Sequence, residues 1–431
     1  MDLIIKGKTG RIFGEIRVPG DKSISHRSII LGALAEGDTV VKNILVSDDV
    51  LRTIQAFKDM GVNIEFVADE IIIHGVGLYG LKKPERHVDC GNSGTTARLM
   101  SGILAGQKFL STLVGDQSLS RRPMDRVIIP LRKMGAEIYG RDDKYLPLEI
   151  KPAKSKLKAI SYELPVASAQ VKSAILLASL YANGTTEIIE NKTTRDHTER
   201  MLKLFGCKIR RKGNSIIMDS YSLLKGKNIY VPGDISSAAY FIVAAAMVEG
   251  SDLLIKDVGI NPTRDGIIHV LKKMGANIAI INERIVNNEP VGDIRVRYAP
   301  LTGISIDREI TGIIIDEIPI LAVAASVAKG RTIIRDVKEL KYKESNRIYA
   351  ISKELSKMGT KIEALEDGMI IEGVDRLKGA VVDSHGDHRI AMALSIAALV
   401  AEGSTIIGNH ECVSISYPNF FDTLELIYRD V

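Results

Sequence analysis

The sequence predicts an α/β protein built from six copies of one strand-helix-strand-helix-strand unit, and three observations support this fold class. Six glycines recur at intervals of 66 to 80 residues along the 431-residue chain. Each closes an apolar stretch of helical length and precedes a β-rich run such as TVVKNIL, LLIKDV or TIIRDV. In the first five copies a second glycine follows 22 to 29 residues later, as in KDMGVNI and KKMGANI. The six glycines that recur at intervals of 66 to 80 residues are Gly37, Gly106, Gly184, Gly250, Gly330 and Gly403.

The two helices of each copy differ in their expected environment. The first is apolar almost all round, as in AILLASLYA and FIVAAAMV, and is predicted to be buried. The second is amphipathic and rich in lysine, as in DRVIIPLRKMG, so it is expected to face solvent and to end at a C-cap glycine before a strand. In the sixth copy the chain ends at LELIYRDV, where that glycine would fall. The first residues, MDLIIKGKTGRIFGEIRVPG, predict a strand pair joined by a turn rather than a secretory signal.

Six units divide most simply into two domains of three units each. We expect one discontinuous domain over residues 1–20 and 234–431, and a second over residues 21–233. The chain would cross between them near 18–21 and 231–234, because both segments carry the same VPGD sequence. A cleft between the domains is the expected place for a ligand, with closure of the domains on binding.

Polar clusters open the apolar helices, in segments such as GDKSISHRS, GNSGTTAR, GDISSAA and GDHRIA. Helix capping alone explains such residues. Basic residues in the same clusters are not explained by capping, because a cation beside the positive end of a helix costs stability unless an anion is bound there. These residues are Lys22, Arg27, Arg98, Lys172 and Arg389, and they indicate a phosphate or carboxylate ligand.

The composition is that of a globular protein that acts on small anions. Apolar residues make up 45% and charged residues 26% of the chain, and the formal net charge is +5 without long basic runs. No tryptophan is present, so a basic face with aromatic platforms for nucleic acid is not expected. The longest charge-free apolar stretch, IAMALSIAALVA, is short for a membrane span. Three cysteines without CxxC spacing favour the cytoplasm and give neither disulfides nor a zinc site.

Eight motifs, in order along the chain, together resemble the 5-enolpyruvylshikimate-3-phosphate synthase family of enolpyruvyl transferases. They are GDKSISHRS, GNSGTTARL, SLSRRPMDR, ASAQVKSA, RDHTERM, IDEIPILA, KESNRI and GDHRIAMA. The resemblance implies two inside-out α/β domains of three repeats each. It also implies transfer of the enolpyruvyl group of phosphoenolpyruvate to the 5-hydroxyl of shikimate 3-phosphate, through a tetrahedral ketal, with loss of phosphate. It implies no metal or organic cofactor, and we expect a monomer.

The resemblance assigns roles to individual positions. Asp316 matches the base that takes the proton of the 5-hydroxyl, and Glu344 with Lys22 matches the groups that move protons on the methylene carbon. The shikimate 3-phosphate contacts implied are Lys22, Ser23, Arg27, Ser168, Ala169, Gln170, Arg195, Asp316 and Lys343. The phosphoenolpyruvate contacts implied are Lys22, Gly94, Arg122, Gln170, Arg347 and Arg389.

Two positions depart from the family pattern. Ala169 stands where many members have a second serine, so we expect Thr194 or Arg195 to replace that contact. Ser414 stands where many members have a lysine, which leaves the response to the family's herbicide inhibitor, glyphosate, open. Gly94 favours sensitivity, because no side chain crowds the pocket there.

Other interpretations fit these residues less well. UDP-N-acetylglucosamine enolpyruvyl transferase shares the fold, but the loop 115–123 lacks the cysteine of that enzyme. A non-catalytic phosphosugar-binding protein would gain nothing from Asp316 and Glu344 in an anionic site. His26 is expected to pack in a helix interface. His385 is expected to hydrogen-bond in the active site, because no third ligand completes a metal site with it and His388.

Overall fold

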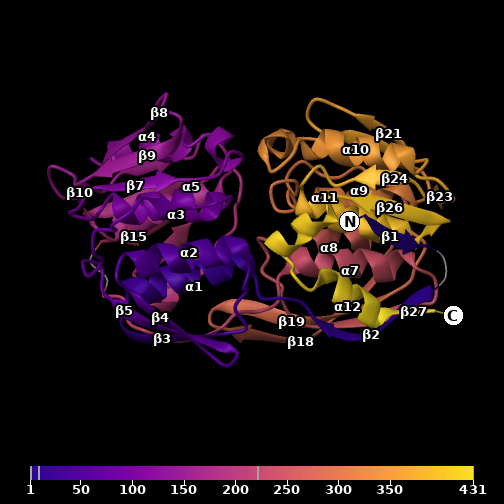
Figure 1. Cartoon of the computed structure of the whole chain (residues 1–431), viewed down its shortest axis with the longest axis horizontal. Coiled ribbons are helices and arrows are strands. Elements are labelled where there is room, and N and C mark those ends of the chain that lie inside the picture. The colour runs from indigo at the N-terminus through magenta and orange to yellow at the C-terminus, as the bar shows by residue number, and fades with distance from the viewer. Residues whose placement is uncertain (1, 8–9, 221–222, 431) are drawn as a thin grey trace. The chain divides into compact units, whose positions relative to one another are not determined.

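The computed structural model describes residues 2–7, 10–220 and 223–430, and the chain forms two compact units (Figure 1). Unit 1 consists of Met1–Pro19, Pro232–Ile285 and Pro290–Val431, and unit 2 of Gly20–Val231 and Val286–Glu289. Each unit has its own hydrophobic core. The turn expected at residues 8 and 9 lies outside the described residues. Within the described part of the chain, no helix is long and apolar enough to cross a membrane.

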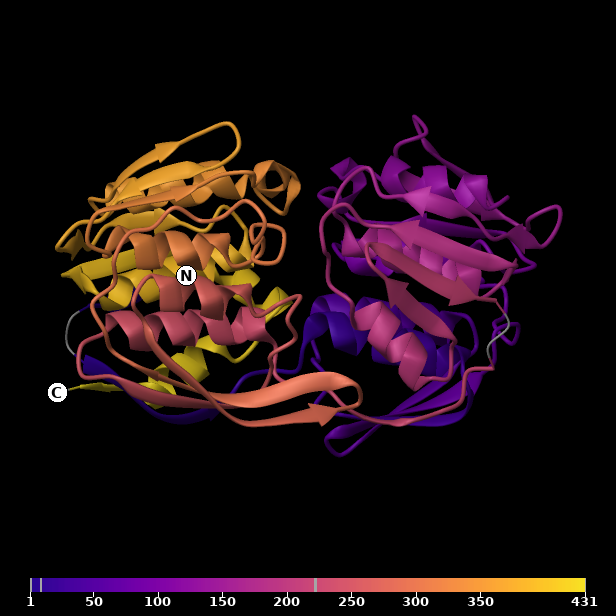
Figure 2. The same ribbon diagram turned by 180° about the vertical axis from the view of Figure 1, so that it is seen from behind.

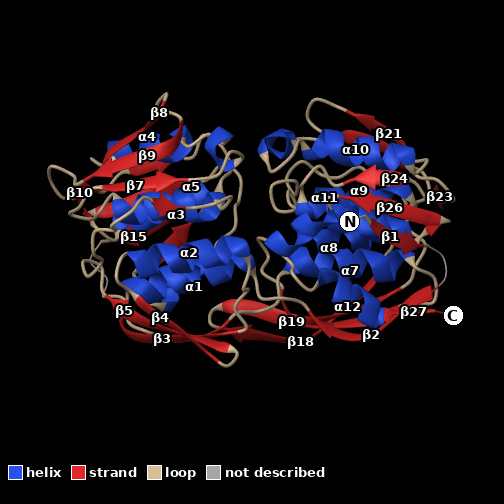
Figure 3. Ribbon diagram, in the orientation of Figure 1, coloured by secondary structure: helices blue, strands red, loops and turns tan. Residues whose placement is uncertain are grey.

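Helices and sheets alternate within each unit (Figure 3). The helices of unit 2 are α1 (Lys22–Leu34), α2 (Asp48–Asp59), α3 (Gly94–Leu104), α4 (Asp125–Lys133), α5 (Ala169–Ser179) and α6 (His197–Leu204), with the 3-10 helix η1 (Leu119–Arg121). Those of unit 1 are α7 (Ile235–Met247), α8 (Gly266–Lys273), α9 (Ile318–Ser326), α10 (Arg347–Lys357), α11 (His388–Leu399) and α12 (Phe420–Ile427), with η2 (Lys338–Tyr342) and η3 (His410–Ile415).

The strands form small sheets, each belonging mainly to one copy of the repeat. In unit 2 they are β3 (Glu36–Lys42), β4 (Asn63–Val67), β5 (Glu70–Val76), β6 (Val88–Asp89), β7 (Ser111–Val114), β8 (Glu137–Arg141), β9 (Tyr145–Lys151), β10 (Leu157–Lys158), β11 (Ser161–Glu163), β12 (Ala182–Asn183), β13 (Thr185–Ile189), β14 (Ile209–Lys212), β15 (Ser215–Asp219) and β16 (Asn228–Tyr230). In unit 1 they are β1 (Leu3–Lys6), β2 (Gly10–Arg17), β17 (Asp252–Gly259), β18 (Asn277–Val286), β19 (Glu289–Arg297), β20 (Arg331–Ile334), β21 (Lys361–Ala364), β22 (Met369–Glu372), β23 (Leu377–Lys378), β24 (Val381–Asp383), β25 (Ala401–Glu402), β26 (Ser404–Gly408) and β27 (Tyr428–Asp430).

The predicted repeat is confirmed, and the structure adds one strand to it. In the second copy, β6 pairs in parallel with β7 across the crossover helix α3, and α4 then leads into the antiparallel hairpin β8–β9. Parallel neighbours require such a crossover, which explains why the first helix of each copy is sandwiched in the core. The sheet orders β6-β7-β9-β8 and β11-β13-β15-β14 show the same arrangement in two successive copies.

Strands far apart in the sequence complete three of the copies. β16, after the third copy, pairs in parallel with β3 of the first. β2 pairs in parallel with β17 of the fourth copy, and β1 pairs antiparallel with β26 of the sixth. β27, at the end of the chain, joins the edge of β2. The repeat is therefore closed by segments that a contiguous sequence pattern does not reveal.

The predicted difference between the two helices of a copy is also confirmed. In α7, every side chain except that of Ser237 is buried, whereas α2 buries only its Val50, Thr53, Ile54, Ala56 and Phe57 face. α3 and α5 pack so closely that a Cβ at Gly102 would lie 2.2 Å from the carbonyl oxygen of Ala174. The second helices α2, α4, α6, α8 and α10 each end two residues before a glycine with positive φ, which directly follows the C-cap residue.

The polar helix starts are caps in five of the six first helices. The side chains of Asp21, Ser93, Ser168, Asp234 and Asp387 each accept a hydrogen bond from a backbone N–H in the first turn. α9 is the exception, because Glu317 at its N-cap turns its carboxylate elsewhere.

One hairpin contributes to both units. Figure 2 shows β18 and β19 as a long antiparallel pair whose arms belong to unit 1. Its tip, residues 286–289, belongs to unit 2, where Glu289 Oε1 lies 2.8 Å from His197 Nδ1 and the carbonyl of Asn288 accepts from Arg200 at 2.7 Å. The observed crossings between the units thus include this tip as well as Pro19–Gly20 and Val231–Pro232.

Candidate active site

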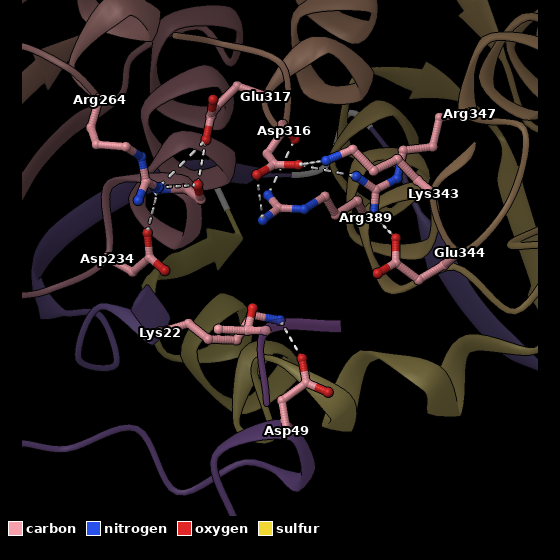
Figure 4. Close-up of polar contacts among 12 residues, drawn as sticks. Lys22, Asp49, Asp234, Arg264, Asp316, Glu317, Lys343, Glu344, Arg347 and Arg389 are labelled. Carbon is pink, nitrogen blue, oxygen red and sulfur yellow. Dashed lines mark hydrogen bonds and ion pairs between the residues drawn. The ribbon is translucent and has the colours of Figure 1, made fainter. Parts of the chain in front are cut away.

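Three cations of unit 1 converge on Asp316, which immediately precedes the N-cap of α9 (Figure 4). Lys343 Nζ lies 3.1 Å and Arg347 Nη1 3.4 Å from Asp316 Oδ1. Arg389, in the first turn of α11, donates from Nη1 to the Asp316 carbonyl at 3.2 Å and places Nη2 3.9 Å from Oδ2. Motifs separated by 27 to 73 residues are thereby joined in one cluster.

Arg347 is the centre of this cluster, and its residue is only 1% exposed. It donates to Asp387 from Nε at 2.8 Å and from Nη2 at 3.3 Å, and to Glu344 from Nη2 at 2.5 Å. Burial alone would lower the pKa of Arg347, but Asp387 and Glu344 more than offset it and raise that pKa above its ordinary value. Arg347 is therefore a permanent cation held among three carboxylates.

Asp387 was predicted only as part of a helix cap, and the structure gives it a second function. It is fully buried, and besides capping α11 it accepts hydrogen bonds from Arg347 and from Ser345 Oγ at 3.0 Å. Burial opposes ionisation of Asp387, but the field of Arg347 keeps its pKa below the ordinary value. The position of Arg347 is thus fixed by a carboxylate of the motif GDHR whose presence helix capping alone would explain.

Arg389 also lies in a strongly anionic environment. Burial lowers the pKa of Arg389, but Asp316, Tyr240, Glu317 and Asp234 raise it to a net value above the ordinary one. A guanidinium in this field remains charged at any pH at which the protein folds.

A second buried cluster of unit 1, which sequence reasoning missed, adjoins Asp316. Glu317 accepts a hydrogen bond from the Ser236 hydroxyl, and Arg264 Nη2 donates to Ser236 Oγ at 2.6 Å and to Asp234 Oδ1 at 3.2 Å. The sequence signals are the dipeptide Asp316-Glu317, in which a charged residue opens an otherwise apolar helix, and the polar segment GDISSAA, which contains Asp234 and Ser236.

In unit 2, the first two turns of α1 carry Lys22, Ser23 and Arg27. Lys22 Nζ pairs with Asp49 Oδ2 at 2.9 Å, and Ser23 is half-buried (Figure 4). Arg27 donates to the Ser23 carbonyl at 2.8 Å, to Thr198 Oγ1 at 2.6 Å and to Ser173 Oγ at 2.8 Å. Burial lowers the pKa of Arg27 to about 10, so it remains charged near neutral pH although its direct partners are uncharged. Such a cation favours an anionic ligand.

A second set of predicted residues of unit 2 lies at the start of α3 and at Arg122, the C-cap residue of η1. Gly94 opens the helix, and a Cβ placed on it would lie 3.1 Å from Arg98 Nη1 and 3.6 Å from Arg122 Nη1. Arg98 donates to Gln170 Oε1 at 2.5 Å, and Arg122 donates to Asn92 Oδ1 at 2.6 Å. Two guanidinium groups thus flank the positive end of a helix at a position without a side chain, an arrangement suited to a phosphate.

The remaining predicted residues of unit 2 lie at the starts of α5 and α6. Ser168 caps α5, so its hydroxyl accepts from Val171 N at 3.4 Å, and Ala169 is the first residue of that helix. The Thr194 hydroxyl donates to buried Glu190, so of the two expected replacements for the missing serine we retain Arg195, which is half-buried.

Lys172 differs from the other basic residues of the helix starts. It is fully buried and pairs with Glu190 at 2.9 Å and with Glu199 at 2.6 Å. Its charge is therefore compensated within the protein, and the suggestion that it holds an anionic ligand is not supported.

The histidines take structural positions. His26 is fully buried, its Nδ1 lies 2.7 Å from Thr53 Oγ1, and burial lowers its pKa to about 3, so it is a neutral packing residue as predicted. His385 was expected to hydrogen-bond in the active site; among the described residues its ring lies 2.9 Å from buried Glu354 Oε1 rather than beside Asp316. No group of three or more His, Cys, Asp or Glu residues in the described ranges is arranged to hold a metal ion.

Ser414 lies in η3, where its hydroxyl donates to the carbonyl of Glu411 at 2.9 Å. A serine at this position is exposed and supplies no positive charge.

The residues around Asp316 in unit 1 and the basic residues at the helix starts of unit 2 together suit acid–base chemistry on anions. The carboxylates Asp316 and Glu344 lie against permanent cations, which stabilise their ionised form and leave them able to accept a proton from a ligand. The Arg98 and Arg122 pair and the buried Arg27 suit phosphates or carboxylates.

Comparison with known proteins agrees with this chemistry. The family model "EPSP synthase (3-phosphoshikimate 1-carboxyvinyltransferase)" matches residues 6–424. A 3-phosphoshikimate 1-carboxyvinyltransferase of Brevibacillus brevis is 53% identical over 415 residues, covering 96% of this chain and 97% of that protein. One of Thermoanaerobacter sp. (strain X514) is 53% identical over 427 residues, covering 99% and 100%. A solved structure of EPSP synthase from Acinetobacter baumannii superposes with a TM-score of 0.90 at 46% identity, covering 99% of this chain and 98% of that one.

Proposed function

The chain belongs to the EPSP synthase (3-phosphoshikimate 1-carboxyvinyltransferase) family, and on that premise we propose that it joins the enolpyruvyl group of phosphoenolpyruvate to the 5-hydroxyl of shikimate 3-phosphate. The products are 5-enolpyruvylshikimate 3-phosphate and inorganic phosphate, so no redox partner is needed. This reaction supplies the synthesis of chorismate and the aromatic amino acids.

Asp316 is the general base of the proposed reaction. It takes the proton of the 5-hydroxyl while that oxygen forms its bond to C2 of phosphoenolpyruvate. The observation that carries the assignment is the pair of cations on one of its oxygens, Lys343 at 3.1 Å and Arg347 at 3.4 Å. They favour the ionised carboxylate that a base requires, and Lys343 also binds the shikimate ligand.

Glu344 and Lys22 move protons on the methylene carbon of phosphoenolpyruvate. A proton added to that carbon gives the tetrahedral ketal, and removal of a proton from the resulting methyl group expels phosphate. Glu344 lies 2.5 Å from Arg347, which supports its ionised form in the second step. Lys22, paired with Asp49, supplies the proton in the first.

Cations and backbone amides bind the substrates, which carry about six negative charges between them. Arg347 and Arg389 clamp the carboxylate of phosphoenolpyruvate, and its phosphate binds at Gly94 and Arg122, with Lys22 and Gln170 in contact with both substrates. Shikimate 3-phosphate is bound by Ser23, Arg27, Ser168, Ala169, Gln170 and Arg195 from unit 2 and by Asp316 and Lys343 from unit 1.

Neither unit alone carries the whole of this set, which supports a two-domain enzyme with hinges at residues 18–21 and 231–234. We place the enzyme, as a monomer, in the cytoplasm, in keeping with three free cysteines. The glycine at position 94 supports sensitivity to glyphosate.

A phosphate-release assay tests the proposal. Purified protein is mixed with phosphoenolpyruvate and either shikimate 3-phosphate or UDP-N-acetylglucosamine, and inorganic phosphate is followed continuously. We expect release only with both phosphoenolpyruvate and shikimate 3-phosphate. Release with the uridine nucleotide as acceptor, or with phosphoenolpyruvate alone, would reject the assignment.

A further inference from the structure

The buried carboxylate of Glu317 is tied to two other chain segments of unit 1. Its residue is 1% exposed, and that of Arg264, in the loop before α8, is 2% exposed. A relay runs from Arg264 Nη2 to Ser236 Oγ at 2.6 Å, and the Ser236 hydroxyl in turn donates to Glu317 Oε1. Glu317 Oε1 also lies 4.0 Å from Arg264 Nη2, so the carboxylate is paired with a cation through the same segment.

Burial of these charged groups lowers the stability of the fold relative to apolar residues, which suggests a function other than stabilisation. A buried carboxylate needs a compensating charge, and an apolar pair of similar volume would be as stable or more stable. The cluster includes Asp234, which caps α7 and also accepts from Arg264 at 3.2 Å. It therefore joins the start of α7 to the start of α9 with charged groups, in a position where Glu317 does not cap its own helix.

The peptide between Asp316 and Glu317 is held from two directions. On one side the Glu317 side chain is anchored to Ser236. On the other side the carbonyl of Asp316 accepts from Arg389 Nη1 at 3.2 Å. A peptide fixed at both ends restricts the backbone from which the Asp316 side chain extends, and this is the side chain that meets Lys343.

We propose that Glu317 is a positioning residue for Asp316: through Ser236 and Arg264 it fixes the start of α9 so that the carboxylate of Asp316 is held at the reacting oxygen. The inference rests on the proposed function, since it assigns Asp316 as the base.

The consequence is a specific kinetic signature. A base that is displaced by a fraction of an ångström loses rate, but the ligands bound by other groups keep their affinity. We expect Glu317→Ala to lower kcat about 30-fold or more while both KM values stay within about threefold. Glu317→Gln retains an oxygen that can accept from Ser236, so it should keep about a third or more of kcat.

Ser236→Ala tests the relay from its other end. It removes only the hydroxyl, so it is the variant to use if Glu317→Ala does not fold, and we expect about a 10-fold loss of kcat with unchanged KM values.

Glu354 provides a matched control in the same unit. It is fully buried, forms an ion pair with Lys357 at 2.5 Å and lies 2.9 Å from the ring of His385, but among the described residues it forms no hydrogen bond or ion pair with the Asp316 cluster. Glu354→Ala should lower the melting temperature and leave kcat of the folded enzyme unchanged. A loss of kcat in Glu354→Ala equal to that in Glu317→Ala would show that any buried glutamate has this effect and would overturn the proposal.

The same phosphate-release assay distinguishes a failure of the proposed function from a failure of the proposed positioning of Asp316. If the unchanged protein releases no phosphate with both substrates, the proposed function fails. If it is active and Glu317→Ala keeps kcat within about threefold, or if Glu317→Gln is as impaired as Glu317→Ala, the positioning of Asp316 by Glu317 is refuted. Full kcat in Ser236→Ala would refute it as well.

Discussion

Replacement of Arg347 by lysine tests the predicted binding of phosphoenolpyruvate most sharply. Arg347 donates four hydrogen bonds to three carboxylates, at 2.8 and 3.3 Å to Asp387, 2.5 Å to Glu344 and 3.4 Å to Asp316. A lysine keeps the charge but has a single nitrogen, so it cannot reproduce the fork. Loss of one prong of a bidentate contact to the substrate carboxylate costs about 1.5–3 kcal/mol, which corresponds to about a 10- to 150-fold rise in KM for phosphoenolpyruvate.

Steady-state kinetics with each substrate varied in turn measure this effect. KM for shikimate 3-phosphate should stay within about threefold, because other groups bind that ligand. Arg295→Lys is a matched control, since Arg295 also makes a two-pronged contact with a carboxylate, Asp252, but at the surface. It should leave both KM values and the melting temperature unchanged. An Arg347→Lys enzyme whose KM for phosphoenolpyruvate rises less than about twofold would refute the assignment.

Three further predictions follow from the same geometry. Asp316→Asn should lower kcat by about 10²- to 10⁴-fold with little change in shikimate 3-phosphate affinity, measured by calorimetry, and a near-normal kcat would remove Asp316 from its role. Gly94→Ala should raise KM for phosphoenolpyruvate about 10-fold and weaken glyphosate, because the added Cβ comes within 3.1 Å of Arg98 and 3.6 Å of Arg122; unchanged values of both would contradict this. His26 has a folded pKa of about 3, below its unfolded value, so its stability contribution is complete above the unfolded pKa and is lost as pH falls. Denaturant unfolding should show about 2 kcal/mol of this loss between pH 7 and pH 5, and His26→Gln should remove it.

The repeated elements could be predicted because each depends on local chemistry. Glycines such as Gly61 and Gly135 end helices wherever the chain must turn with positive φ, and apolar periodicity marks the buried helices. The closure of the repeats could not be predicted in this way. β16 and β2 complete sheets that lie far away in the sequence, and pairing over such distances leaves no local signal.

The site was predictable where motifs carry several charged residues together. Lys343, Glu344 and Arg347 occur within one short segment, and the structure brings them to Asp316. Lys172 shows the limit of that reasoning, because a basic residue at a helix start can equally be neutralised by buried carboxylates from a later segment.

Residues that hold the site residues in place were not predicted, because their contacts are made by segments far apart in the sequence. Arg264 and Glu317 are ordinary charged residues in the sequence, and only burial and distance reveal that they form a pair. Asp387 was likewise interpreted as a cap because a cap explains it completely until its contact with Arg347 is seen.

The transfer itself is tested most directly by carbon NMR of a reaction with phosphoenolpyruvate labelled at C2. The protein is incubated with the labelled substrate, shikimate 3-phosphate and UDP-N-acetylglucosamine together. The account predicts that the label appears in an enol ether on the 5-oxygen of shikimate 3-phosphate, with one phosphate released per transfer. Label found on the uridine nucleotide, or retained wholly in phosphoenolpyruvate, would contradict it.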